Sequence, residues 1–276
     1  MNARPKRGVR PPLHAGGRRI ATMTSPQFAR AVAACDTVLL PLASIEQGGR
    51  HCPLGTDLLV ADAVACRIAE AADCLVAPTI PYGDALELCA WPGTVDAGTT
   101  AFAAYVEAVA GALLRQGFRS IVFLGCHSLD LRAVDGVCRR LRAQGYGVGA
   151  IDWWRAVGAA AQGETKSAAP FGHCGEVITS ALLALAPDAV DLAGAADEAP
   201  LPGLAFALAH GPGSAFVAYG TFGDYCRSGA WGEVKAVASA DRGRVWIDRA
   251  IADAARFIGE LRCALPPATR DPRPAR

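Results

Sequence analysis

The chain has 276 residues, of which 52% are apolar and 19% are charged. This composition is sufficient to bury one sizeable core, so one domain is the default expectation. The formal net charge of +1 gives no electrostatic case for nucleic acid or an acidic partner, because a nucleic-acid binder normally shows a basic face. No apolar run reaches the ~18 residues that a membrane span requires, so we expect no membrane segment.

The two ends of the chain differ in composition from the rest. The first residues, including Arg4 to Arg7, are rich in Arg, Pro and Gly and contain no apolar segment of the kind found in secretory signals. We therefore predict a cytoplasmic protein with disordered tails over residues 1–25 and 266–276. The part between them, residues 26–265, is predicted to be a single α/β domain.

The ten cysteines are irregularly spaced, and none forms a C-x-x-C pair. This spacing argues against a zinc ribbon and against a small disulfide framework. Most of the ten are expected to be small buried apolar side chains.

Short apolar runs alternate with longer amphipathic segments along the chain. These runs predict strands at 37–44, 74–80, 120–125, 147–153 and 215–219. They predict helices at 57–72, 99–116, 130–144, 175–185 and 240–265. This order is typical of parallel βαβ units. The strands are apolar throughout, as expected when helices cover both faces of the sheet.

Polar side chains follow the predicted strands, where active sites of such sheets form. Glu46 and Asp57 come after the first strand, and His127 comes after the strand at 120–125. Two carboxylates and one imidazole suit a catalytic zinc or manganese ion and leave a position open for water. Each residue also has an alternative to a metal-binding role. The carboxylates of Glu46 and Asp57 could simply be solvated, and Asp57 could be the N-cap of its helix. His51, in the same loop, could be a structural histidine that bonds the loop backbone.

Several other chemistries find no support in the sequence. There is no Gly-rich dinucleotide or phosphate fingerprint opening a helix, and no G-x-S-x-G nucleophile elbow.

The motifs of the chain together resemble the creatininase (creatinine amidohydrolase) family. The resemblance is carried by residues 40–57, with the sequence LPLASIEQGGRHCPLGTD, and by later segments that occur in the same order as in the family: 81–83, 91–94, 123–130, 173–180, 220–224 and 240–243. Any one match is weak, but together they cover nearly the whole predicted domain.

The resemblance implies a three-layer α/β/α sandwich around a mainly parallel sheet, assembled as a homo-oligomer, often a hexamer. It implies hydrolysis of a C–N bond in an amide or cyclic amide, with a small-molecule substrate and zinc or manganese, iron being possible. The family positions correspond to Glu46, Asp57 and His127 as metal ligands, with His173 as a proton shuttle, and Glu176 is a second candidate for moving protons. Substrate-binding candidates are Tyr82 and the pair Trp153 and Trp154, which could equally be core or interface aromatics.

The chain departs from the family pattern where the family binds a second metal. Gly48 replaces a histidine ligand, Leu129 replaces an acidic ligand, and Ile178 replaces a glutamate. Because these side chains cannot coordinate, the resemblance implies one retained divalent ion per subunit.

Three interpretations are compatible with the sequence: a one-metal hydrolase, a catalytically silent relative that serves as a scaffold or binds a ligand, and a site rebuilt around cysteines. The third is suggested by Cys52, Cys126 and Cys174, each of which neighbours a motif histidine.

Overall fold

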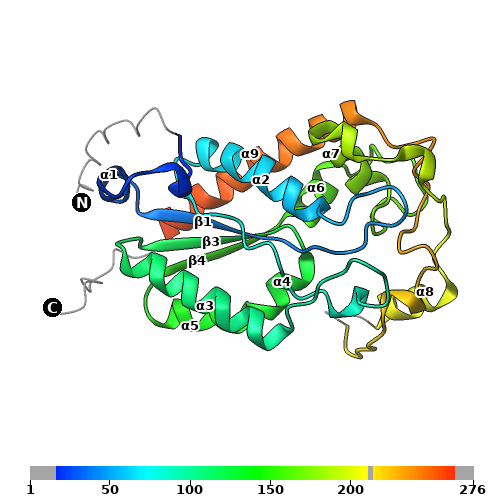
Figure 1. Cartoon of the computed structure of the whole chain (residues 1–276), viewed down its shortest axis with the longest axis horizontal. Helices are drawn as coiled ribbons and strands as arrows, with labels where there is room; N and C mark the ends of the chain where they lie inside the picture. The colour runs from blue at the N-terminus through cyan, green and yellow to red at the C-terminus, as the bar shows by residue number, and fades with distance from the viewer. Residues whose placement is uncertain (1–16, 211–213, 265–276) are drawn as a thin grey trace, which may run out of the picture.

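The computed structural model describes residues 17–210 and 214–264. Its centre is a four-stranded parallel sheet in the order β2-β1-β3-β4, built from Leu75–Val76, Thr37–Leu42, Ser120–Gly125 and Gly147–Asp152, respectively. Every residue of β1 and β3 is buried, because helices cover both faces of the sheet. Figure 1 shows α2 (Thr56–Ala71) and α9 (Ala240–Ala264) on one side, and α3 (Thr99–Arg115) and α5 (Asp135–Ala143) on the other. The predicted α/β/α sandwich is confirmed.

Two segments predicted as regular elements are interrupted. The strand predicted at 74–80 is reduced to β2. Ala77 N still donates to Leu39 O at 2.9 Å, but the next donor to β1 is Ile80 N, which bonds Pro41 O at 3.0 Å, so one extra residue in this segment interrupts the regular ladder. The helix predicted at 130–144 begins earlier, as α4 (Ser128–Ala133), and breaks at Val134 before α5.

The strand predicted at 215–219 is wrong. Its side chains have strand propensity, but no ladder partner for it lies among the described residues, and Phe216 and Tyr219 are 72% and 95% exposed. Three helices were missed: α1 (Ser25–Ala34), α6 (Trp153–Ala160) and α8 (Pro202–Ala209). The remaining helix, α7 (Glu176–Leu185), starts one residue later than predicted.

The predicted tails lie mostly outside the described residues. Residues 1–16 and 265–276 lie outside the described part of the chain. Residues 17–25 differ from the prediction, since Val76 N donates to Arg18 O at 2.9 Å, a short 3-10 helix spans Ile20–Thr22, and α1 begins at Ser25. No helix among the described residues is long and apolar enough to cross a membrane.

The sheet order positions the site. From β1 the chain goes to β2 on one side and then to β3 on the other, so the strand order reverses between β1 and β3. The register pairs Leu42 with Gly125, the last residues of these two strands. The loops that follow therefore start side by side, and such a switch point is where open α/β sheets bind ligands.

Candidate metal centre

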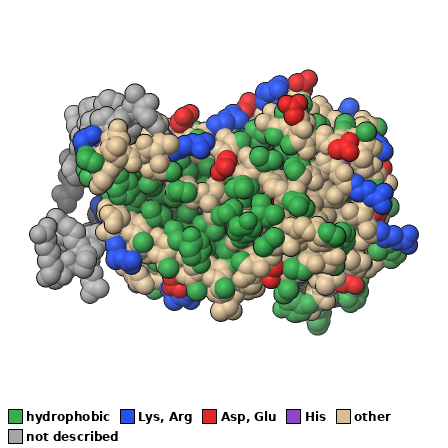
Figure 2. Space-filling model, viewed as in Figure 1, with side chains coloured by type: hydrophobic (Ala, Val, Ile, Leu, Met, Phe, Trp, Pro, Cys, Tyr) green, Lys and Arg blue, Asp and Glu red, His purple; other side chains and the backbone are tan. Residues whose placement is uncertain are grey.

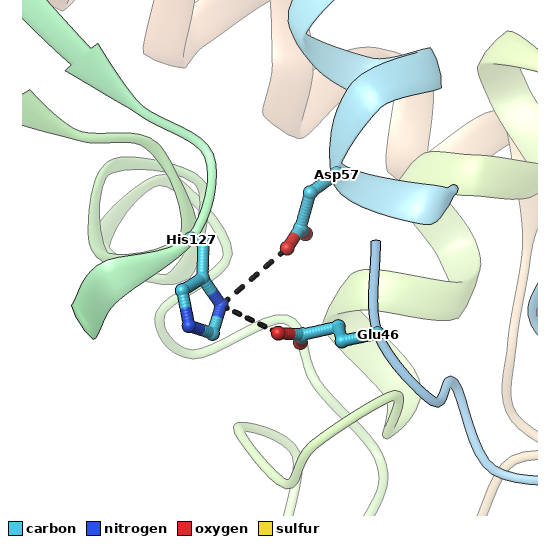
Figure 3. Close-up of side chains that lie close together, drawn as sticks. All are labelled: Glu46, Asp57 and His127. Carbon is cyan, nitrogen blue, oxygen red and sulfur yellow. Dashed lines mark ion pairs between the residues drawn. The ribbon is translucent and has the colours of Figure 1, made fainter. Parts of the chain in front are cut away.

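Three buried side chains meet at this switch point. Glu46 follows β1, Asp57 lies in the first turn of α2, and His127 lies between β3 and α4. Nδ1 of His127 is 2.9 Å from Oε2 of Glu46 and 3.5 Å from Oδ2 of Asp57, and Figure 3 shows the imidazole pointing toward both carboxylates. One donor atom of each residue lies within 4.8 Å of the others, which in the described part of the chain makes this a candidate metal site.

Each carboxylate has one oxygen bonded and one oxygen available. Oε1 of Glu46 lies 3.1 Å from Nε2 of His173, and Oδ1 of Asp57 accepts a hydrogen bond from Nε1 of Trp154 at 3.0 Å. The other oxygens, Glu46 Oε2 and Asp57 Oδ2, are buried and receive no well-aligned hydrogen bond from the described residues. Metal-ligating carboxylates are typically held in this way by outer hydrogen bonds.

Both ring nitrogens of His127 face acceptors. Nε2 lies 2.9 Å from the carbonyl oxygen of Asp84, which can only accept, so we assign the N–H to Nε2. Nδ1 then faces the two carboxylates, and a neutral imidazole has no second N–H to offer them. A cation, either a proton or a metal ion, is needed there. Atoms bound to one zinc ion at about 2.0–2.2 Å lie about 3.3 Å apart, so the donor spacing fits a metal ion.

The charges of the cluster shift the pKa of each member. Burial alone would raise the pKa of Glu46, but the neighbouring imidazoles of His127 and His173 lower it to about 2. Burial and the charge of Glu46 raise the pKa of Asp57 to about 6. Burial opposes a charged His127, yet the two carboxylates raise its pKa well above the ordinary value. Without a metal ion, a proton on His127 therefore holds the cluster together.

His173 lies at the edge of the same cluster. Its Nδ1 is 2.8 Å from the carbonyl oxygen of Gly229, which also accepts from Nε2 of Gln47 at 2.7 Å. The ring packs edge-on against Phe222, with 4.9 Å between ring centroids. Burial would lower the pKa of His173, but the hydrogen bond and charge of Glu46 raise it above the ordinary value. The geometry leaves Nε2 as the atom at which this residue can hold a proton near the cluster.

The structure separates the two predicted tryptophans. Trp153 is fully buried in the core, so its side chain cannot contact a substrate, and its predicted substrate-binding role is corrected. Trp154, the next residue on α6, instead reaches Asp57. Tyr82 is half exposed at the surface.

Glu176 is not brought to the cluster. Its Oε2 accepts from the backbone N–H groups of Lys166 and Ser167, at 2.8 and 2.7 Å, and its Oε1 pairs with Arg242 at 2.6 Å. Because both oxygens are engaged and the side chain is fully buried, we leave Glu176 out of the proposed proton-transfer machinery.

The alternatives for the loop after β1 are also decided by contacts. The N-cap of α2 is Gly55, and no side chain caps the helix, so Asp57 does not have that role. His51 is buried with Nε2 3.0 Å from the carbonyl oxygen of Cys174 and 3.0 Å from the hydroxyl of Thr179, which matches the structural alternative.

The cysteines lie beside the cluster rather than in it. Six of the ten are buried. Cys126 is fully buried, and burial raises the pKa of its thiol well above the ordinary value. The thiols of Cys52 and Cys174 are hydrogen-bonded to each other, which lowers the pKa of Cys52 to about 5 and raises that of Cys174. The donor set in the described residues contains none of these three.

The loop around Gly48 leaves no room for the histidine found in the family. A Cβ atom at Gly48 would lie 2.7 Å from the carbonyl oxygen and 2.8 Å from the Cβ of Cys52. The loop is closed here by a hydrogen bond from Cys52 N to Gly48 O at 3.1 Å. A second-metal ligand at this position would therefore require a different loop conformation.

Sequence reasoning missed the groups that orient the two histidines. These are the carbonyl oxygens of Asp84 and Gly229 and the side chain of Gln47. A backbone carbonyl is present at every residue, so no sequence signal identifies the two that matter. Gln47 and Phe222 did lie within matched motifs and could have been singled out.

Comparisons with known proteins agree with this geometry. The family model described as creatininase, creatinine amidohydrolase, matches residues 21–258. The mycofactocin precursor peptide peptidase of Mycobacterium ulcerans (strain Agy99) is 33% identical over 205 residues, which cover 68% of this chain and 74% of that protein. The creatinine amidohydrolase of Pseudomonas putida is 30% identical over 201 residues, covering 66% and 76%.

Solved structures show the same fold. A manganese form of creatininase superposes with a TM-score of 0.73 at 26% identity and covers 91% of this chain and 100% of that chain. A zinc–zinc form of a creatininase variant gives the same TM-score at 25% identity, covering 91% and 99%. The chain belongs to the creatininase family of amidohydrolase-type hydrolases.

Proposed function

We propose that the protein is a hydrolase of a C–N bond, in an amide or cyclic amide, that works with one divalent ion per subunit. Glu46, Asp57 and His127 would hold the ion through Oε2, Oδ2 and Nδ1. The observation that carries the proposal is a pair of buried carboxylate oxygens, from Glu46 and Asp57, that receive no well-aligned hydrogen bond from the described residues. Both oxygens face Nδ1 of His127, and the other ring nitrogen of that histidine is bonded to the carbonyl oxygen of Asp84. An ion at such a site supplies polarisation of a substrate carbonyl and a lowered pKa for a water ligand.

The remaining residues would bind and move protons around that centre. His173 can hold a proton at Nε2, 3.1 Å from Oε1 of Glu46, while Gly229 O fixes the ring at Nδ1. Phe222 and Trp231 pack around His173 and shield one side of it from water. Trp154 donates a hydrogen bond to Asp57, so its indole lies beside one of the proposed ligands. Zinc and manganese both suit mixed oxygen and nitrogen ligation, and iron is compatible with it.

A single ion is favoured over two by the positions that depart from the family. Gly48 and Leu129 offer no ligand atoms, Ile178 is apolar, and the loop at Gly48 is closed against a side chain. The same departures favour the second candidate function, a catalytically silent relative that acts as an oligomeric scaffold or ligand-binding protein.

A homo-oligomer is supported by the surface. Figure 2 shows apolar side chains gathered in the middle of the face that it draws, with charged side chains mostly toward the margins. Such a face is typical of a contact between proteins. The hexameric state and the cytoplasmic location stay predictions.

Metal analysis distinguishes the two candidate functions. We expect purified protein, loaded with zinc or manganese and desalted, to retain one ion per subunit, and Asp57→Ala to retain none. Asp241→Ala, which removes an exposed carboxylate outside the cluster, should behave as the wild type. A loaded wild type that hydrolyses members of an amide and short-peptide panel supports the hydrolase. A wild type that retains no metal contradicts it and leaves the silent relative.

A further inference from the structure

Asp130 is a fully buried carboxylate that the proposed mechanism does not use. It lies in the first turn of α4, shortly after His127. Its Oδ1 accepts a hydrogen bond from the backbone N–H of Asp84 at 2.8 Å, and its Oδ2 has no partner among the described residues. Burying a carboxylate with so few hydrogen bonds is costly, so its presence calls for a function.

Asp84 connects this carboxylate to the candidate metal ligand. The N–H of Asp84 is bonded to Asp130, and the carbonyl of the same residue accepts from Nε2 of His127 at 2.9 Å. The backbone of Asp84 is therefore held through both its N–H group, by Asp130, and its carbonyl group, by His127. Any shift of that turn changes the position of the acceptor that determines the orientation and tautomer of His127.

The neighbouring glycine allows the turn to approach the carboxylate. A Cβ atom on Gly83 would lie 2.0 Å from Oδ1 and 2.6 Å from the carboxyl carbon of Asp130. Only a residue without a side chain permits this close approach. The close contact between the turn and the carboxylate therefore depends on two residues. Gly83 has no side chain to block it, and Asp130 supplies a short acceptor.

We infer that Asp130 is a positioning residue that acts through the Asp84 peptide to hold His127 with Nδ1 aimed at Glu46 and Asp57. The inference rests on the proposed function, because it assigns Asp130 to the same metal site. Outer hydrogen bonds of this type fix the orientation of metal-ligating histidines, and their loss commonly weakens metal binding about 10–100-fold.

A merely structural role would give a different result. Asp130 also lies near the N-terminus of α4, where a carboxylate stabilises a helix through its charge. That role would change stability and leave the metal affinity of the folded protein unchanged. The amide of Asn keeps an oxygen acceptor for Asp84 N–H and removes the charge, so Asp130→Asn separates the two roles.

The experiment measures zinc affinity of the full-length protein by competition with a chromophoric chelator. We expect Asp130→Ala to bind zinc about 10–100-fold more weakly than the wild type, and Asp130→Asn to bind within about threefold of it. Equal affinity of Asp130→Ala and wild type overturns the inference, and so does equal weakening in both variants, which would implicate the charge. A wild type that binds no zinc overturns the proposed function as well, so the two failures are distinguishable.

A second variant covers the case in which Asp130→Ala does not fold. Gly83→Ala leaves the carboxylate in place but puts a Cβ atom where Oδ1 lies. It should weaken zinc binding in the same direction, whereas Gly259→Ala, at a position where an added Cβ meets no atom, should not. Wild-type affinity in Gly83→Ala overturns the inference.

Discussion

The indole N–H of Trp154 donates a 3.0 Å hydrogen bond to Oδ1 of Asp57, while the other carboxylate oxygen of Asp57 faces His127. Trp154 therefore contributes to the site by positioning Asp57. The bond orients Asp57 so that Oδ2 stays available at the cluster, and it lowers the pKa of a carboxylate that burial and Glu46 raise.

Trp154→Phe should weaken zinc binding by about tenfold, because it removes the N–H that orients Asp57 and keeps the aromatic ring. The matched control is Trp153→Phe, since the indole nitrogen of Trp153 is buried with no hydrogen-bond partner among the described residues. Chelator competition measures both variants. Similar zinc affinities for the two would show that the Trp154 bond does not contribute.

His173 should titrate above the ordinary histidine value in the metal-free protein, because the hydrogen bond and charge of Glu46 outweigh the effect of burial on its pKa. Glu46→Gln should lower that pKa. NMR spectra of the imidazole between about pH 5 and 9 measure the change. Asp241→Asn, at an exposed carboxylate, is the control, and an unchanged titration in Glu46→Gln would remove Glu46 as the cause.

Asp130 should make the metal-free protein less stable as the pH rises. Burial raises the pKa of its carboxyl to about 7. A carboxyl group whose folded pKa is raised stabilises the fold below the unfolded pKa, and this contribution is lost as the pH rises through the folded pKa. From about pH 4 to pH 8 the wild type should therefore lose stability relative to Asp130→Asn, on the order of a few kcal/mol.

Urea unfolding at several pH values, with metal removed by chelation, checks this difference in stability. Asp241→Asn should follow the wild-type pH dependence. If Asp130→Asn follows it too, Asp130 titrates at the same pH in the folded and unfolded chains.

Gly48→His should fail to restore a second metal ion. The new Cβ atom would meet the carbonyl oxygen of Cys52 at 2.7 Å, so the loop must deform, at a cost of about 1–3 kcal/mol in unfolding free energy. We expect at most one ion per subunit by elemental analysis and a lower midpoint in urea. Gly259→Ala is the control for an unhindered glycine, and two ions per subunit in Gly48→His would show that the loop can open.

The double variant Cys126→Ser, Cys174→Ser should keep one ion per subunit. Burial raises the pKa of the Cys126 thiol, and the hydrogen bond that Cys174 donates to Cys52, together with burial, raises that of Cys174, so both stay protonated and are poor ligands. Elemental analysis and thermal unfolding distinguish metal loss from simple destabilisation. Loss of metal in a folded double variant would support a site rebuilt around cysteine.

The sequence alone was sufficient for the α/β architecture, because apolar periodicity and helix signals are local. The strand at 120–125 was predicted with its observed bounds, and α9 within one residue. The family motifs also pointed to Glu46, Asp57 and His127, which the chain places at strand ends and in the first turn of a helix.

Tertiary structure decided which of the candidate side chains work together. Trp153 and Trp154 are neighbours with the same chemistry, yet only the packing of α6 buries one and aims the other at Asp57. Glu176 lies in a matched motif, but Arg242, which is far away in sequence, engages it elsewhere. The carbonyl of Asp84 orients His127 only because parallel pairing and a glycine turn bring distant segments within hydrogen-bonding distance, and such contacts leave no local pattern in the sequence.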